Sequence, residues 1–302
     1  MIVDCYTHTW ESPDELGRCQ PINGHGHDGP TAGILRAGNA RHLAAAEPVD
    51  TTIVLGFKSH YLAAEVSNAR IAEYVGNHPD RLIAFAGIDP SNPRLAIEEM
   101  LHARDELKMP GLAVAPAAQD FHPSNSQAMR VYTEAAQLGM PILFHNGMFL
   151  TAATKLEYAQ PVLLDEVARE LPSLKIVIGQ MGAPWIHETL ALLAKHRNVF
   201  AEISGLLHQP WLAYQALLSA SQSGVIDRLL FGSGFPRASA AQYIEELYHI
   251  NHLVHGTNLP TIPRDQLRGI VSRDALGLLG IAPRREPSPI PAGLHTDDDG
   301  ED

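Results

Sequence analysis

The sequence is poor in cysteine, with Cys5 and Cys19 as the two thiols in 302 residues. Two cysteines provide neither a disulfide framework nor a CxxC zinc pattern, and they fit a reducing compartment. Runs of about 18 apolar residues, which a transmembrane helix needs, are also missing. Because the amino terminus lacks the basic and apolar regions of a signal peptide, we expect a cytoplasmic protein.

Positive charge is scarce as well. Lys and Arg together number 22 against 34 Asp and Glu, which gives a formal net charge of -12. This charge repels the phosphates of nucleic acids and the head groups of anionic lipids. We therefore expect neither a nucleic acid nor a membrane as a partner.

The end of the chain differs in composition from the rest. Prolines recur between residues 283 and 291 and precede five acidic residues, Asp297, Asp298, Asp299, Glu301 and Asp302. A segment of this composition cannot bury enough apolar surface to fold. We predict one folded domain over residues 1–282, followed by a disordered, Pro-rich and acidic tail over residues 283–302.

Short runs of β-branched and apolar residues recur along the chain and predict strands. They occupy residues 2–6, 51–57, 82–88, 112–115, 141–145, 175–180, 199–203 and 228–232. Stretches with apolar residues at spacings of three and four lie between them and predict helices over residues 125–138, 161–171, 186–196 and 243–255.

Alternating strands and helices of this kind are typical of parallel strands that are buried on both faces. Eight such units predict an α/β fold, a closed parallel (β/α)8 barrel of the TIM type in a single domain. A doubly wound open sheet is the alternative. The Gly-rich residues 11–33 predict a long loop that would overhang the active face of the barrel.

Barrel enzymes carry their reacting groups at the carboxyl ends of the strands. The chemically useful residues at the predicted strand ends are Tyr6, His8, Trp10, His60, His145, Gln180, Glu202 and Ser233. Neither Ser204 nor Ser233 lies in a GxSxG pattern, so a serine hydrolase is not expected.

Several ordered motifs resemble one family. They are NHPDR at residues 77–81, GIDP at 87–90, LGMPILFHNG at 138–147, GAPW at 182–185 and RLLFGSGFP at 228–236. The chain resembles the amidohydrolase-related (amidohydrolase 2) family, which includes metal-dependent hydrolases and nonoxidative decarboxylases of the aminocarboxymuconate-semialdehyde type. The resemblance implies a barrel and a divalent metal held by HxH on strand one, His on strands five and six, and Asp on strand eight.

The sequence departs from that metal site at most of its positions. His8 and His145 match two of the ligands, whereas Tyr6, Gln180 and Gly234 stand where the family has His, His and Asp. A zinc-type site needs three or more N, O or S donors, and neutral amides are poor ligands. Loss of the strand-eight carboxylate also removes the base that activates a metal-bound water. We therefore expect no cofactor and no metal-hydroxide hydrolysis.

Two functions from different classes follow. The first is a catalytically silent or accessory subunit in a complex with a metal-bearing paralogue, which could be a hydrolase, a decarboxylase or a hydroxylase; His8 and His145 would then be inherited histidines in a pocket without an ion. The second is an enzyme for a small carboxylated metabolite, in which Tyr6, His60, Glu202 or His208 would help to hold Zn, Mn or Fe. A pocket that binds a ligand without transforming it is a third possibility. A homo- or hetero-oligomer is expected.

Overall fold

The computed structural model describes residues 1–19, 36–146 and 151–282. Its centre is a sheet of eight parallel strands, each paired with the next along the chain. They are β1 (Val3–Thr7), β2 (Thr51–Leu55), β5 (Leu82–Gly87), β6 (Gly111–Val114), β7 (Ile142–Phe144), β8 (Ile176–Ile178), β9 (Val199–Glu202) and β10 (Leu229–Leu230). All eight predicted strands and the TIM-type barrel are confirmed. The predicted tail, and residues 20–33 of the predicted loop, lie outside the described residues.

The first strand and the segment after the last one close the barrel. The backbone nitrogen of Cys5 donates to the Phe231 carbonyl at 2.9 Å, and that of Gly234 donates to the Tyr6 carbonyl at 3.0 Å. A third bond runs from the His8 nitrogen to the Phe235 carbonyl at 3.1 Å. Closure brings the carboxyl ends of all eight strands to one rim, where a barrel places its functional groups.

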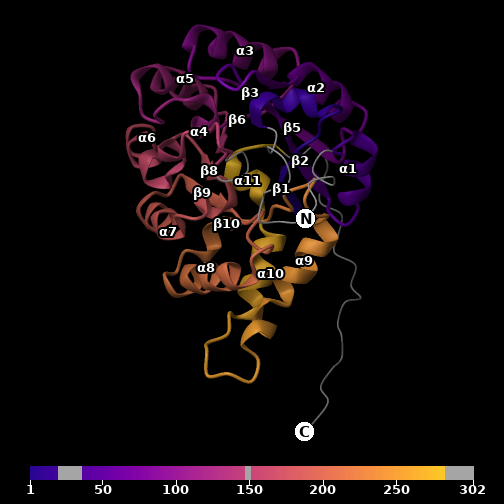
Figure 1. Ribbon diagram of the computed structural model, residues 1–302, viewed down its shortest axis with the longest axis vertical. Coiled ribbons are helices and arrows are strands. Elements are labelled where there is room, and N and C mark those ends of the chain that lie inside the picture. The colour runs from indigo at the N-terminus through magenta and orange to yellow at the C-terminus, as the bar shows by residue number, and fades with distance from the viewer. Residues whose placement is uncertain (20–35, 147–150, 283–302) are drawn as a thin grey trace.

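Helices surround the strands, as Figure 1 shows. The α-helices are α1 (Asn39–Ala45), α2 (Asn68–Gly76), α3 (Pro93–Asp105), α4 (Pro116–Gln119), α5 (Ser126–Gln137), α6 (Asp165–Glu170), α7 (Ile186–Lys195), α8 (Pro210–Gln222), α9 (Ala240–Tyr248), α10 (Arg264–Ser272) and α11 (Ala275–Leu279). The 3₁₀ helices are η1 (Pro13–Cys19), η3 (Leu156–Ala159), η4 (Pro161–Leu164), η5 (Gly179–Gly182), η6 (Ile226–Arg228) and η7 (Ile250–Val254). None of the helices formed by the described residues combines the length and apolarity needed to cross a bilayer.

The predicted helices 125–138 and 186–196 correspond closely to α5 and α7. The other two differ in their bounds. Helix α9 begins before Tyr243, because the Ser239 side chain accepts a hydrogen bond from the Gln242 nitrogen and caps the helix there. Residues 161–171 divide into η4 and α6, and residues 250–254 form η7.

A hairpin follows β2 and was not predicted. Strand β2 ends at Leu55, and β3 (Phe57–Ser59) pairs antiparallel with β4 (Ala64–Val66). The Ser59 hydroxyl stabilises the turn, since it accepts from the Leu62 nitrogen at 2.9 Å and donates to the Ala118 carbonyl at 2.6 Å. His60 therefore lies in the exposed turn of this hairpin and not at the end of a barrel strand.

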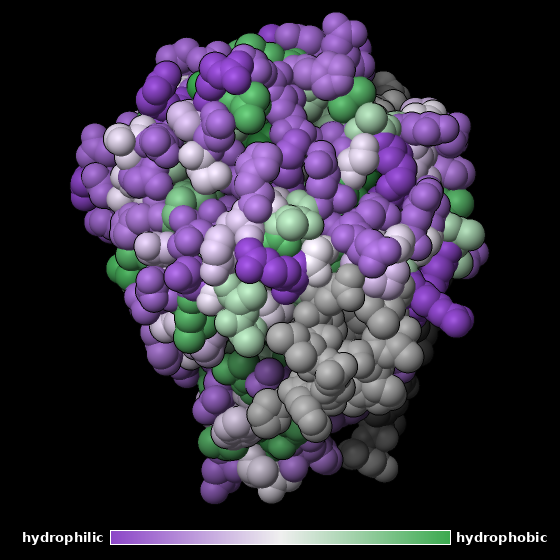
Figure 2. All heavy atoms as spheres, turned by 45° about the horizontal axis from the view of Figure 1, so that its top comes forward, coloured by the Kyte–Doolittle hydropathy of each residue, from purple (hydrophilic) through white to green (hydrophobic). Residues whose placement is uncertain are grey.

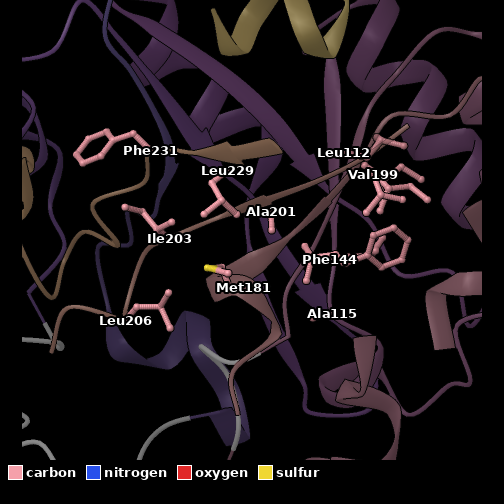
Figure 3. Close-up of a cluster of buried hydrophobic side chains, with 14 of the residues drawn as sticks. Leu112, Ala115, Phe144, Met181, Val199, Ala201, Ile203, Leu206, Leu229 and Phe231 are labelled. Carbon is pink, nitrogen blue, oxygen red and sulfur yellow. The ribbon is translucent and has the colours of Figure 1, made fainter. Parts of the chain in front are cut away.

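The core has two layers because successive strand residues face opposite sides. Inward residues such as Ile53, Phe85 and Phe200 fill the barrel, and α11 packs against them. In Figure 1, α11 overlies the centre of the ring of strands. The outward residues lie between the strands and the helices; Figure 3 shows Leu112 and Phe144 in this layer. On the face drawn in Figure 2, hydrophilic side chains predominate and hydrophobic ones are scattered.

Gly87, the last residue of β5, lies where two segments of the barrel wall approach closely. A Cβ added there would press on the Phe57 backbone nitrogen and lie 2.6 Å from the carbonyl carbon of Gly56. We expect Gly87→Ala to lower the free energy of unfolding by about 1–3 kcal/mol in urea titrations. Gly76→Ala is the control, because its Cβ would meet nothing within 4 Å. A Gly87→Ala protein as stable as the control would contradict this packing.

Candidate functional site

Three aromatic side chains form a compact cluster at the carboxyl rim. Tyr6 and His8 come from β1 and its end, and His145 follows β7. The Tyr6 hydroxyl and the His145 Nδ1 are hydrogen-bonded at 2.7 Å. The His8 ring centroid lies 5.2 Å from that of Tyr6 and 5.1 Å from that of His145. The structure thus brings together Tyr6 and His8, from the end of the first barrel strand, and His145, from the end of the fifth.

Burial keeps this cluster uncharged at neutral pH. It lowers the pKa of His8 to about 3, against the opposing effect of a hydrogen bond to the Leu55 backbone. It also lowers the pKa of His145 well below the usual range, and the neighbouring His8 adds to this shift. Burial raises the pKa of Tyr6 well above its usual range, and the charge of Glu202 contributes. The cluster is therefore a neutral hydrogen-bonded group.

The residues present do not fit the metal site of the family. Tyr6 stands at one ligand position, and its neutral hydroxyl is hydrogen-bonded to the Nδ1 atom of His145, where the family has a second imidazole. At Gly234 the φ angle is +74°, and an added Cβ would lie 3.2 Å from the Ser204 Cβ, which is tighter than ordinary packing. Among the described residues, no group of three or more His, Cys, Asp or Glu side chains is arranged to hold a metal ion.

Glu202 is directed into the barrel because the preceding residues of β9 alternate, with Phe200 facing in and Ala201 facing out. The Glu202 side chain has room inside the barrel because residue 232 is glycine. A Cβ at that position would collide with the Glu202 carboxylate and would lie 3.0 Å from the Tyr6 Cβ. A larger residue at position 232 would leave no room for both side chains.

The Glu202 carboxylate is fully buried and is engaged by donors from two loops. Ser204 donates its backbone nitrogen at 2.6 Å and its hydroxyl at 2.9 Å. The Gln180 backbone nitrogen donates to the same carboxylate. Burial raises the pKa of Glu202 to about 7, these hydrogen bonds oppose the shift, and the charge of Asp4 adds to it. Glu202 therefore holds the ends of β8 and β9 together.

The same bond supports an unusual backbone. Gln180 and Met181 have φ angles of 53° and 47°, in the left-handed region that residues other than glycine seldom adopt. Such conformations persist where the surroundings hold them. The hydrogen bond from Gln180 to Glu202 is one such constraint. The Gln180 side chain itself is buried at the rim.

Ser233 contributes to barrel closure. Its backbone nitrogen donates to the Asp4 carboxylate at 2.9 Å, and the Tyr6 nitrogen donates to the same oxygen at 3.2 Å. Burial raises the pKa of Asp4 to about 6, and its hydrogen bonds with Ser233 and Tyr6 oppose this shift. Asp4 thus connects β1 to the segment after β10 below the aromatic cluster.

Trp10 and His60 lie outside the cluster of Tyr6, His8 and His145. Trp10 is buried and pairs through its backbone with Ala37. Its indole nitrogen is buried and has no hydrogen-bond partner among the described residues. His60 lines a separate hollow of about 350 Å³ with Lys58 and Glu99, whose side chains pair at 2.9 Å.

Sequence reasoning missed His42, which lies on α1 beside β1. Its Nδ1 and the Tyr74 hydroxyl are 2.8 Å apart, and its Nε2 and the Thr7 hydroxyl are 2.9 Å apart. Burial lowers the pKa of His42 to about 4. No motif surrounds His42, and its partners are 32 and 35 residues away in the chain. Both ring nitrogens are engaged, so His42 stabilises β1.

The raised pKa of Glu202 makes stability depend on pH. The folded protein keeps the proton up to about pH 7, whereas the unfolded chain loses it near 4.5. The unfolding free energy should therefore fall between these values as pH rises, by about 3 kcal/mol from this group. Glu202→Gln should flatten that fall in urea titrations, and Glu73→Gln, at an exposed position, should not. Identical pH profiles for the native and Glu202→Gln proteins would contradict this.

The fold is shared with solved structures of low sequence identity. An uncharacterized TIM-barrel protein from Bordetella bronchiseptica is 20% identical over 92% of this chain and 98% of that one, with a TM-score of 0.69. 2,6-Dihydroxybenzoate decarboxylase from Rhizobium is 17% identical over 92% of this chain and 98% of that one, with a TM-score of 0.67. A dihydroxybenzoic acid decarboxylase from Polaromonas sp. JS666, whose structure contains manganese and 2-nitroresorcinol, is 15% identical over 92% of this chain and 96% of that one. Its TM-score is 0.65. Identities this low establish a common fold alone.

No curated protein matches the sequence. The family model described as amidohydrolase matches residues 3–281, from the first residue of β1 to the end of the barrel. The motifs that suggested this family all lie within the matched range. The chain therefore belongs to the amidohydrolase family.

Proposed function

We propose that this protein is a catalytically silent or accessory subunit in a complex with a metal-bearing paralogue of the same family. The observation that carries the proposal is the hydrogen bond between Tyr6 and His145, at 2.7 Å. A side chain that replaces one ligand has become the partner of another. The bond pairs one ring nitrogen of the surviving histidine with a neutral hydroxyl, and this supports a structural role for the ring.

The replacements form a consistent set. Tyr6 and Gln180 are neutral and buried, and Gly234 adopts a backbone conformation that suits glycine. The two buried carboxylates beside them are already engaged, since Glu202 accepts from Ser204 and Gln180 and Asp4 accepts from Tyr6 and Ser233. Nothing in this arrangement supplies the anionic donor and base that metal-assisted hydrolysis requires.

The retained barrel suggests that its surface or shape is still needed. The similar decarboxylases are named for dihydroxybenzoates, and one contains manganese. We infer that the partner is a hydrolase, decarboxylase or hydroxylase for a small carboxylated metabolite. The two buried free cysteines, Cys5 and Cys19, support a cytoplasmic location for the complex.

Metal content tests the proposal directly. After expression with added Zn, Mn and Fe, the purified untagged protein should contain less than about a tenth of an ion per chain by elemental analysis. His145→Gln, which removes an imidazole and keeps a hydrogen-bonding group, is the control and should give the same low value. A stoichiometric ion that disappears in His145→Gln would establish the remodelled enzyme instead.

Co-expression with a paralogue that keeps all five family ligands tests the assembly. The two chains should co-purify through size-exclusion chromatography, and the paralogue should be more active in the complex than alone. Tyr6→Phe in this chain should leave the activity of the complex within about twofold, since the chemistry resides in the partner. The proposal fails if the chains elute separately, or if Tyr6→Phe abolishes turnover in a folded complex.

A further inference from the structure

A basic pocket of about 510 Å³ lies at the amino-terminal end of the barrel, opposite the aromatic cluster. Lys175, Arg197 and Arg228 directly or closely precede the starts of β8, β9 and β10, so their side chains gather on one rim. Arg273 follows α10 and adds a fourth cation. The residues of α11 and its end form the facing wall.

The positive charge in this pocket is not balanced. Asp227 is the one acidic residue among the described residues that line it. Within the described chain, none of the four cations takes part in an ion pair. This is unusual in a chain with a formal net charge of -12. Concentrated positive charge in a concave site attracts anions.

Two of the guanidinium groups are held in place by their surroundings. Arg228 donates to the Arg197 carbonyl at 2.7 Å, and its guanidinium carbon lies 5.5 Å from the centroid of the Phe200 ring. Arg273 donates to the Leu229 carbonyl at 2.9 Å. Partial burial lowers the pKa of Arg273, the charge of Asp227 opposes this shift, and the guanidinium remains protonated. Because Asp227 is one acidic neighbour for four cations, a bound anion would reduce the cost of holding these cations together.

We propose that this pocket binds a polyanion that carries at least two phosphate or carboxylate groups. Four cations from separate segments can engage more than one anionic group, and guanidinium groups match the geometry of both. The volume lies within the range of about 300–1,000 Å³ that is usual for ligand sites. Because barrels carry out chemistry at the other end, the ligand is an effector and not a substrate.

Two sources of this chemistry are available. One is a free small polyanion. The other is the acidic terminus of this chain, because Gly280 lines the pocket and the acidic residues 297–302 follow within 22 residues of it. Carboxylates on the same chain would reach a high effective concentration at the pocket.

Calorimetric titration of the full chain with inorganic pyrophosphate, at constant ionic strength, tests the site. We expect a dissociation constant at least about tenfold lower than for inorganic phosphate, since more cations are engaged. The variant Lys175→Gln/Arg197→Gln should weaken pyrophosphate binding at least about tenfold. Neither of these two native side chains makes a hydrogen bond to the part of the chain that the structure describes. Arg130→Gln, at an exposed position elsewhere, is the matched control and should bind as the native protein does.

A full-length variant with Asp297→Asn, Asp298→Asn and Asp299→Asn distinguishes a free polyanion from the acidic terminus of the chain as the ligand of the pocket. Tighter pyrophosphate binding in this variant would show that the acidic terminus competes for the pocket, and unchanged binding would show that the ligand is a free polyanion. The proposal is overturned if neither the native protein nor this variant binds pyrophosphate at about 10 mM. It is also overturned if Arg130→Gln weakens binding as much as the pocket variant does.

Discussion

The hydrogen bonds that join β1 to the segment after β10 determine the geometry of the rim. Asp4 accepts from Tyr6 and Ser233, and the neighbouring backbone bonds complete the junction. Because Tyr6 lies on β1 and His8 directly follows it, the junction fixes where these rings stand relative to His145. The aromatic cluster, the buried Glu202 and the space left by Gly232 all depend on a barrel closed in this register.

The barrel could be predicted from sequence because each of its strands is a nearly continuous apolar run, buried on both faces. Alternation within β9 also explains why Glu202 faces inward. The hairpin after β2 could not be predicted in this way, since Phe57 continues the apolar run and the turn depends on contacts of Ser59 with distant residues. The displaced position of His60 follows from the same missing information.

The candidate site, like the fold, could be predicted from sequence only in part. Strand order alone predicts that His8, His145 and Tyr6 approach one another, because the carboxyl ends of parallel barrel strands share a rim. It does not predict which ring nitrogen meets which hydroxyl, or that backbone nitrogens would engage Glu202. These details depend on side-chain conformations and on partners far away in the chain. His42 was missed for that reason.

The backbone at Gly234 restricts which side chains this position can carry. A carboxylate reintroduced there would require a side chain in a left-handed conformation, with its first carbon crowded against Ser204. The cost in folding would arise with that one substitution, whereas the family's ligand set would also need changes at Tyr6 and Gln180. A sequence with the carboxylate alone would therefore be less stable without having the complete ligand set. Selection for stability would oppose that first step, so glycine should persist at position 234.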